Sequence, residues 1–340
     1  MKWSRPLVFA VAVILAAVAA LVGTATLISP VDARSTEQVV IQVAAGASTN
    51  DIAAQLKQAG LIRSRTGFRV LIAIERADGR LRAGEYQFGP NLSMRGIIDR
   101  MVRGQVVTYP FTIPEGFTVA QIADLLARKG FADAVKLKSI LSNVTVPFTY
   151  AVKNKVIKQP YEGYLFPDTY QYYKGMTEEA LVAAMLSRFQ ANFGPDLQAR
   201  AAELKMTIPE VVTLASIIER EARVPEERAL ISAVYHNRLK LGMKLDADPT
   251  VRYALDKPGD IVTFKDLEVN SPYNTYKNAG LPPGPIANPG LASIRAALFP
   301  ADVPYLYFVA KNDGTGAHEF SRTLAEHLRA VQKYSKPPGK

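Results

Sequence analysis

The sequence contains no cysteine and only three histidines among its 340 residues. Disulfide bonds, thiolate metal sites and cysteine nucleophiles are therefore excluded. The histidines form no HExxH pattern, so we expect no metal site, and nothing in the sequence indicates a cofactor. RNA-recognition, zinc-finger and basic-region patterns are absent too. We therefore expect no nucleic-acid partner, although the net charge is +10.

Charged side chains are also missing from residues 7–28, a run of 22 residues. A helix of this length reaches about 33 Å, and a bilayer core is about 30 Å thick. Lys2 and Arg5 precede the run, so the positive-inside rule predicts a cytoplasmic tail at residues 1–6 and export of everything after residue 30. The alternative is a cleaved signal peptide, although the run is longer than the usual apolar region of such peptides. We predict a single-pass protein of the cytoplasmic (inner) membrane whose other domains lie on the outer, periplasmic side.

An internal repeat follows the apolar run. The pattern of strand, turn and helix in VVIQV, AAGAS and NDIAAQLKQAG returns 70 residues later as TYPFTI, PEGFT and VAQIADLLARKG. The copies share a turn glycine, an N-cap hydroxyl and a terminal glycine: Gly46 and Gly116, Ser48 and Thr118, Gly60 and Gly130. Between them we expect a helix near residues 66–76, a strand at 84–88 and a helix at 93–102.

Short strand–helix units of this kind resemble LysM-type wall-binding modules. We therefore predict a LysM-like repeat region at residues 38–130. A packing scaffold that binds nothing is the alternative, because the same pattern is common in other folds. Residues 131–160 carry no sharp motif and are expected to connect this region to the next domain.

The best-defined helix of the second half begins at a capping box, Thr207 to Glu210. On a helical wheel, Thr213 and Ser216 lie on the expected solvent side, whereas Glu219 and Glu221 flank the apolar stripe. Burial and the negative end of the helix dipole would keep such a carboxyl protonated, as a general acid requires. An ion pair with Arg220, Arg223 or Arg228 is the alternative, and the wheel cannot choose between the two glutamates.

Several other segments have a clear local pattern. Residues 162–170 (EGYLFPDTY) predict an aromatic-lined loop or, alternatively, a loop that fills the core. Residues 280–290 contain four prolines and three glycines, which predicts a rigid, shaped loop. Residues 305–310 predict a buried strand, and residues 317–334 a closing helix.

Motifs from residue 161 onward resemble, in their order, those of the endolytic murein transglycosylase (YceG-like) family. They are EGYLFPDTY, LASIIEREA, NRLxxGMxLxxDPTVxY, YNTY, GLPPGPIANPG and YLYFVA. The resemblance extends over roughly residues 38–335 and includes the N-terminal anchor. It implies an α+β protein with a transmembrane helix at 7–28, a LysM-like front domain and a mixed α+β catalytic domain at 161–335.

The resemblance implies a lytic transglycosylase that cleaves the β-1,4 bond between N-acetylmuramic acid and N-acetylglucosamine within glycan strands. The 6-hydroxyl of the muramic acid attacks its own anomeric carbon and leaves a 1,6-anhydro end. The family's catalytic glutamate corresponds to Glu219. Glu162, Asp248 and Asn274 match the family's motifs and are expected to orient or bind the sugar, with structural roles in their loops as the alternative. The expected partners are peptidoglycan glycan strands, the cytoplasmic membrane and, by family analogy, peptidoglycan polymerases.

Two other functions stay open. A muramidase would use water as the nucleophile, with Asp246, Asp248 or Glu162 as a second carboxylate. A non-catalytic scaffold would bind peptidoglycan through the front region without cutting it.

Overall fold

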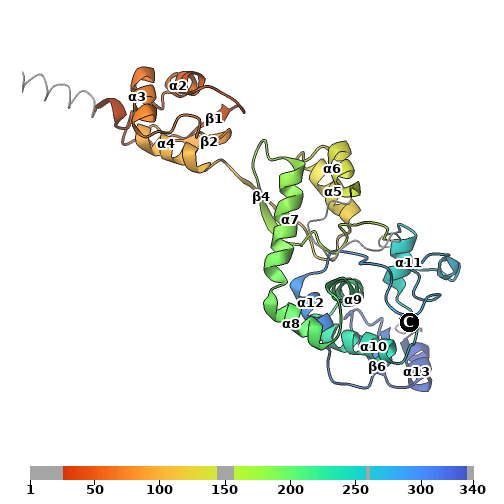
Figure 1. The fold of residues 1–340 in the computed structure, drawn as a ribbon. Coiled ribbons are helices and arrows are strands. Elements are labelled where there is room, and N and C mark those ends of the chain that lie inside the picture. Colours follow the sequence, from red (N-terminus) through yellow and green to blue (C-terminus); the bar gives the residue numbers. More distant parts are fainter. Residues whose placement is uncertain (1–25, 144–156, 258–260, 335–340) are drawn as a thin grey trace, which may run out of the picture. The chain divides into compact units, whose positions relative to one another are not determined.

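The computed structural model describes residues 26–143, 157–257 and 261–334 (Figure 1). Contacts divide the chain into two compact units, Met1–Pro110 with Gln171–Met176, and Phe111–Tyr170 with Thr177–Lys340. The predicted cytoplasmic tail and residues 7–25 of the predicted membrane span lie outside the described residues. Within the described ranges, no helix combines the length and the apolar character needed to cross a membrane.

In the first unit, two helices lie between two paired strands in the order of the sequence. β1 (Val39–Val43) pairs antiparallel with β2 (Gly84–Phe88), and α2 (Thr49–Gln58) and α3 (Arg65–Ile74) connect them. α4 (Met94–Arg103) follows β2. Alternate strand residues and one face of each helix share a core that includes Ile41, Val43, Ile52, Leu56, Phe68, Ile72, Tyr86, Phe88, Ile97 and Met101. The sequence-based prediction of all five elements is confirmed.

The predicted repeat is present as local structure. Ser48 caps α2 and Thr118 caps α5 (Val119–Arg128), each in a reciprocal capping box with the residue three positions later. The turns before the caps contain Gly46 at φ +77° and Gly116 at φ +75°, a conformation that favours glycine. The same residue pattern therefore produces the same strand exit and helix start twice.

The two copies nevertheless belong to different units. β3 (Tyr109–Thr112), the strand of the second copy, pairs with β4 (Thr169–Tyr172), and the division of the chain falls within these two strands. This differs from the predicted boundaries, which place residues 38–130 in one region. The reason is packing: Phe111 and Ile113 are buried in the core of the second unit, so the second copy folds with that unit.

The second unit is mainly helical. Besides α5 it contains α6 (Ala134–Ser142), α7 (Glu178–Asn192), α8 (Pro195–Glu203), α9 (Ile208–Glu221), η1 (Pro225–Glu227), α10 (Arg228–Lys240), α11 (Asp248–Ala254), η2 (Asp266–Glu268), α12 (Leu291–Leu298) and α13 (Leu324–Tyr334). α6 lies in the segment that we expected only to connect two domains, and it packs against α5 and α7. The described residues thus form a mixed α+β fold, with small antiparallel sheets and many helices.

α9 is the central helix of this unit. It packs against α8, α10, α11 and α12, and every residue from Val211 to Ile218 is buried. The predicted solvent side through Thr213 and Ser216 is therefore wrong. The Ser216 hydroxyl donates to the Thr213 carbonyl (2.7 Å) and accepts the N–H of Ile286 (3.0 Å), so its polarity is satisfied inside the protein. This contact fastens the proline-rich 280–290 loop to α9.

The C-terminal part corrects two further predictions. In the described part of the chain β5 (Tyr307–Ala310) has one strand partner, β6 (His318–Ser321), and its residues are half-buried or exposed instead of buried. β6 occupies the start of the segment for which we expected a helix, and α13 begins only at Leu324. His318 is structural, since its Nδ1 lies 2.7 Å from Glu227 Oε2 and its backbone N–H donates to the same carboxylate.

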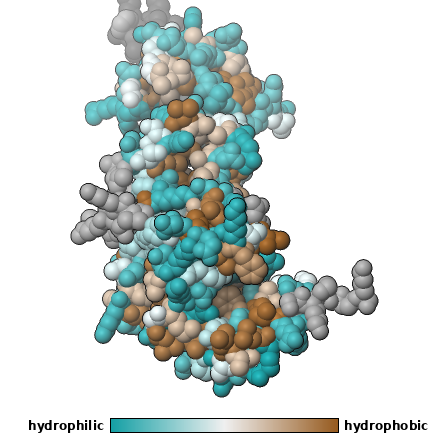
Figure 2. Space-filling view, turned by 90° about the vertical axis from the view of Figure 1, so that its right-hand side faces the viewer, coloured by the Kyte–Doolittle hydropathy of each residue, from teal (hydrophilic) through white to brown (hydrophobic). Residues whose placement is uncertain are grey.

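The surface is of mixed polarity. Exposed large apolar side chains belong to separate elements, among them Ile74 in α3, Val135 in α6 and Leu328 in α13. Hydrophilic and hydrophobic residues are interspersed on the face seen in Figure 2. Single exposed apolar residues are normal on protein surfaces and do not identify a docking site.

Candidate active site

Glu219 lies in the last turn of α9, and its side chain is only 7% exposed. One carboxylate oxygen, Oε2, accepts the N–H of Gly290, the N-cap of α12, at 3.1 Å. The other, Oε1, is 3.9 Å from Nη2 of Arg228, which α10 supplies and Ser293 holds through a 3.2 Å hydrogen bond. Arg228 is one of the three arginines considered as ion-pair partners, but 3.9 Å is long for a charge-assisted hydrogen bond. Both neighbours stabilise a negative charge on the Glu219 carboxylate.

A second carboxylate, that of Glu115, lies beside Glu219. Gly290 has no side chain, and a Cβ there would collide with the Glu115 carboxylate. Partial burial raises the pKa of Glu115, and the negative charge of Glu219 raises it further, whereas Arg228 lowers it. Glu115 and Glu219 therefore interact across a single glycine, although they are far apart in the sequence.

The sequence analysis missed Glu115. It lies in the PEGFT turn of the second repeat copy, at the position that Ala45 occupies in the first copy. The turn reaches α9 because Arg220 Nη1 donates to the Gly116 carbonyl (3.2 Å) and a Cβ at Gly116 would lie 3.5 Å from Glu219 Cγ. A carboxylate that replaces an apolar residue in one copy of a repeat was the available signal.

Asn288 holds this turn against the 280–290 loop. Its backbone carbonyl accepts the N–H of Gly116 (2.9 Å), and its backbone N–H donates to the Phe117 carbonyl (2.8 Å). Its side-chain oxygen accepts the N–H of Leu165 (2.9 Å), and its amide donates to Glu162 Oε1 (3.1 Å). One buried asparagine therefore joins the second repeat copy, the 162–170 loop and the approach to α12.

Glu162 is 2% exposed and accepts hydrogen bonds from three segments. Oε1 accepts the N–H of Val119 at 3.0 Å as well as the Asn288 amide, and Oε2 accepts the hydroxyl of Tyr253 at 3.2 Å. Burial raises the pKa of Glu162 to about 8, and these bonds together with Lys158 counteract only part of that effect. The surrounding residues 161–166 are buried, so this loop fills the core.

Glu221 and Asp248 form a separate carboxylate pair on another side of α9. Tyr235 donates its hydroxyl to Glu221 (3.2 Å), and Tyr276 donates its hydroxyl to Asp248 (2.6 Å). Burial raises the pKa of Glu221 to about 7, and the charge of Asp248 acts in the same direction. Glu221 is thus a half-buried acid with its own hydrogen-bond partner.

Asn274 holds its own loop together. Its amide nitrogen donates to the carbonyls of Leu267 (2.8 Å) and Val269 (2.9 Å), and its oxygen accepts the N–H of Tyr276 (3.0 Å). The residue is fully buried. The structure therefore places Glu162, Asp248 and Asn274 in three different environments, with none of them hydrogen-bonded to Glu219, and their binding of sugar stays a prediction.

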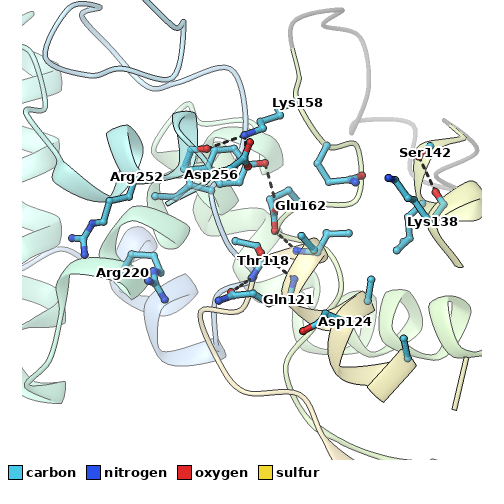
Figure 3. A pocket seen from close by; sticks show the side chains of 18 of the residues that line it. Thr118, Gln121, Asp124, Lys138, Ser142, Lys158, Glu162, Arg220, Arg252 and Asp256 are labelled. Atoms are coloured by element: carbon cyan, nitrogen blue, oxygen red, sulfur yellow. Dashed lines mark hydrogen bonds and ion pairs between the residues drawn. The ribbon is translucent and has the colours of Figure 1, made fainter. Parts of the chain in front are cut away.

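A cavity of about 660 Å³ adjoins this region within the second unit (Figure 3). α5, α6 and α11 contribute most of its walls, and Glu162 and Arg220 line it as well. Glu219 is the residue before Arg220 and is not itself part of the described lining. The buried acid and the cavity are thus linked through the last turn of α9.

Comparisons with known proteins show the family to which this chain belongs. The model of the YceG-like family matches residues 41–333. A protein of Bacillus subtilis (strain 168) named endolytic murein transglycosylase is 37% identical over 91% of this chain and 88% of its own length. A protein of the same name from Streptococcus pneumoniae (strain D39) is 29% identical over 88% of this chain, which spans 60% of that relative's length. The crystal structure of a putative YceG-like protein from Listeria monocytogenes matches with a TM-score of 0.61 and 38% identity, over 87% of this chain and 99% of that one. The chain belongs to the YceG-like family.

Proposed function

We propose that this chain is an endolytic murein transglycosylase, which cuts peptidoglycan glycan strands between N-acetylmuramic acid and N-acetylglucosamine. The names of its relatives support this activity. The observation that carries the assignment of the acid is the position of Glu219, nearly buried at the end of α9 and held by the Gly290 N–H. A carboxyl in such a place can give and take a proton without being surrounded by water.

In the proposed reaction Glu219 serves first as an acid and then as a base. It donates its proton to the glycosidic oxygen, the bond from that oxygen to the muramic acid C1 breaks, and the N-acetylglucosamine leaves with a free 4-hydroxyl. The 6-hydroxyl oxygen of the muramic acid then bonds to C1, and its proton passes to the Glu219 carboxylate. Between the two steps, Arg228 and the Gly290 N–H stabilise the negative charge. No water is consumed, and the enzyme regains its starting state.

The position of Glu115 beside Glu219 is the observation that favours the alternative function, a muramidase. A hydrolase that uses two carboxylates needs the second one near the first. Of the residues considered for this role, Asp246 pairs with Arg238 (2.8 Å), Asp248 binds Tyr276 and Glu162 binds the start of α5. Glu115 is the carboxylate that interacts with Glu219. If water were the nucleophile, Glu115 would be its base.

We further infer that residues 7–28 anchor the chain in the cytoplasmic membrane and that the first unit is a LysM-like module for peptidoglycan strands. The uncharged run supports the anchor. The arrangement of two helices between two paired strands supports a small independent module. A peptidoglycan polymerase in the same membrane is the protein partner that this location favours.

The test of the activity uses full-length protein in detergent, purified sacculi and mass spectrometry of the released fragments. We expect products that are one water lighter than hydrolytic products, because they end in 1,6-anhydro-muramic acid. Glu219→Gln should abolish release, a loss of at least about a thousandfold for a group that transfers both protons. Glu221→Gln is the matched control in the same helix turn and should keep measurable activity.

Two results would contradict this assignment. Products with a reducing end would replace the transglycosylase by a muramidase. An active Glu219→Gln protein beside an inactive, folded Glu221→Gln protein would move the acid to Glu221.

A further inference from the structure

The cavity beside α9 has an apolar wall made of small side chains. Its lining includes Ala120, Ala123 and Ala127 of α5 and Ala134 of α6, with Leu141 and Ile286. A volume of about 660 Å³ falls within the range of small-molecule sites, about 300–1,000 Å³. Walls of this kind accept short aliphatic groups such as methyl groups, without selecting for large rings.

Some of the positively charged side chains that line the cavity form an ion pair with a carboxylate, and others do not. Lys158 is paired with Asp256 at 2.6 Å. Arg220 and Arg252, by contrast, have no carboxylate oxygen within 4.0 Å among the residues that the structure describes. In Figure 3 both arginines lie at one end of the cavity, and Lys138 lies at the opposite end. This end therefore carries two positive charges that form no ion pair within 4.0 Å in the described ranges, although Glu219 and Glu221 act on them from farther away.

The two guanidinium groups also influence each other. Burial lowers the pKa of Arg220, and the positive charge of Arg252 lowers it further. The Nε of Arg252 is buried and has no hydrogen-bond partner in the described ranges. Glu219 and Glu221 are the acids that act on Arg220, and each has another hydrogen-bond donor. Like charges that act on each other in this way are unfavourable unless an anion joins them.

This end of the cavity lies next to the proposed site of bond cleavage. Arg220 follows Glu219 directly, and the Gly116 backbone lies close to both side chains. Muramic acid carries a lactyl ether on C3, and in peptidoglycan a short peptide of alanine and acidic residues extends from its carboxyl. A muramic acid bound at Glu219 would therefore bring carboxylates and alanine methyl groups to within a few bonds of the cavity.

We propose that the cavity between α5, α6 and α11 binds the acidic stem peptide of the muramic acid at the cut bond, and that Arg220 and Arg252 bind a carboxylate of this peptide. The proposal rests on the proposed function, because it takes peptidoglycan as the substrate. The shared ligand chemistry is a carboxylate attached to muramic acid. It could come from the stem peptide or from the bare lactyl group of strands that have lost their peptides.

The binding experiment separates these two sources. Full-length Glu219→Gln protein is titrated calorimetrically with a soluble muramyl tetrapeptide disaccharide, with the same disaccharide bearing a free lactyl carboxylate, and with neutral chitobiose. We expect the first ligand to bind most tightly. Adding Arg252→Gln should weaken it about tenfold, the effect of about one charge-assisted hydrogen bond. Arg252→Lys should restore part of the affinity, and Arg329→Gln, which removes an exposed charge of α13 that does not line the cavity, should change nothing.

Cleavage and stability measurements complete the test. With Glu219 intact, Arg252→Gln should lower kcat/KM on peptide-bearing strands several-fold more than on strands stripped by an amidase. The melting temperature should change little, because Arg252 Nε has no hydrogen-bond partner in the described ranges and the Arg252 charge acts on Glu221 without forming an ion pair. A large drop without a change in affinity would mean a structural arginine.

Other outcomes have equally definite meanings. Equal binding of the peptide-bearing and the bare ligand, or equal effects of Arg252→Gln and Arg329→Gln, would overturn the proposal. If the ligand binds in an Arg252-dependent way but the protein with Glu219 intact cuts no strands, the peptide-binding site is supported and the proposed function is overturned.

Discussion

At the scale of single residues, Glu219 obtains its environment from three parts of the chain. Gly290 supplies a hydrogen bond, Arg228 a positive charge and Glu115 a negative one. The first two stabilise a negative charge on the Glu219 carboxylate, and the third places a second negative charge beside it.

Glu115→Gln tests the contribution of the negative neighbour. The pKa of Glu115 is raised partly by Glu219, and a coupling of this kind acts in both directions. With the charge removed, the acid form of the enzyme should be lost at lower pH. We therefore expect the high-pH limb of the kcat/KM profile to move to lower pH.

The exposed Glu226 of η1 provides the control, and Glu226→Gln should leave the profile in place. An unmoved limb in Glu115→Gln would exclude this electrostatic role. Complete loss of activity in Glu115→Gln would favour the muramidase, in which Glu115 activates water.

At the scale of elements, local signals predicted the helices and strands well. The capping boxes at Ser48, Thr118 and Thr207 mark helix starts that the structure confirms. Such signals depend on neighbours three or four residues away, so the sequence displays them directly. The solvent side assigned to α9 is wrong because its partners come from distant segments, which buried Ser216 as well as the apolar stripe.

Some features of the candidate site could likewise be predicted from the sequence, and others depend on the fold. The position of Glu219 near the end of an apolar helix was visible on a helical wheel, and the family motif selected it over Glu221. Its contact with Glu115 was not visible, because it depends on how Asn288 joins two loops that are far apart in the sequence. Cavity walls from α5, α6 and α11 were hidden for the same reason.

Glu162, which ties α5, α11 and the 280–290 loop together, should make stability depend on pH. Its pKa is about 8 in the folded protein and has an ordinary value of 4.5, so between these values the folded state holds a proton that the unfolded state has lost. Stability from this group is therefore complete below about pH 4.5 and falls as the pH rises towards 8. The slope is at most about 1.4 kcal/mol per pH unit.

Thermal unfolding at pH 5, 6, 7 and 8 measures this dependence. Glu162→Gln, which has no proton to lose, should flatten the decline in melting temperature. Glu203→Gln, an exposed change in α8, should not. A decline of the same steepness in Glu162→Gln would show that other groups cause it.

At the scale of the whole molecule, the proposed anchor would keep the cutting site near the membrane where new strands are made. Membrane fractionation tests this with the full-length chain and a chain that begins at residue 31. We expect the full-length chain to stay in the membrane pellet after an alkaline wash, because residues 7–28 carry no charge. The shorter chain should be released. An intact mass lacking the first 28 or so residues would instead identify a cleaved signal peptide.

The bridge through Asn288 has a consequence for the order of assembly. The ribosome synthesises Glu115 first and Glu219 later, but neither can reach its working position until the asparagine some 170 residues after the PEGFT turn has been made. With the proposed membrane topology, a nascent chain would therefore cross the membrane with both acids in an unassembled form. Lytic activity would arise only after the last third of the polypeptide has been synthesised and exported. Incomplete copies of the enzyme would then be unable to cut the growing wall.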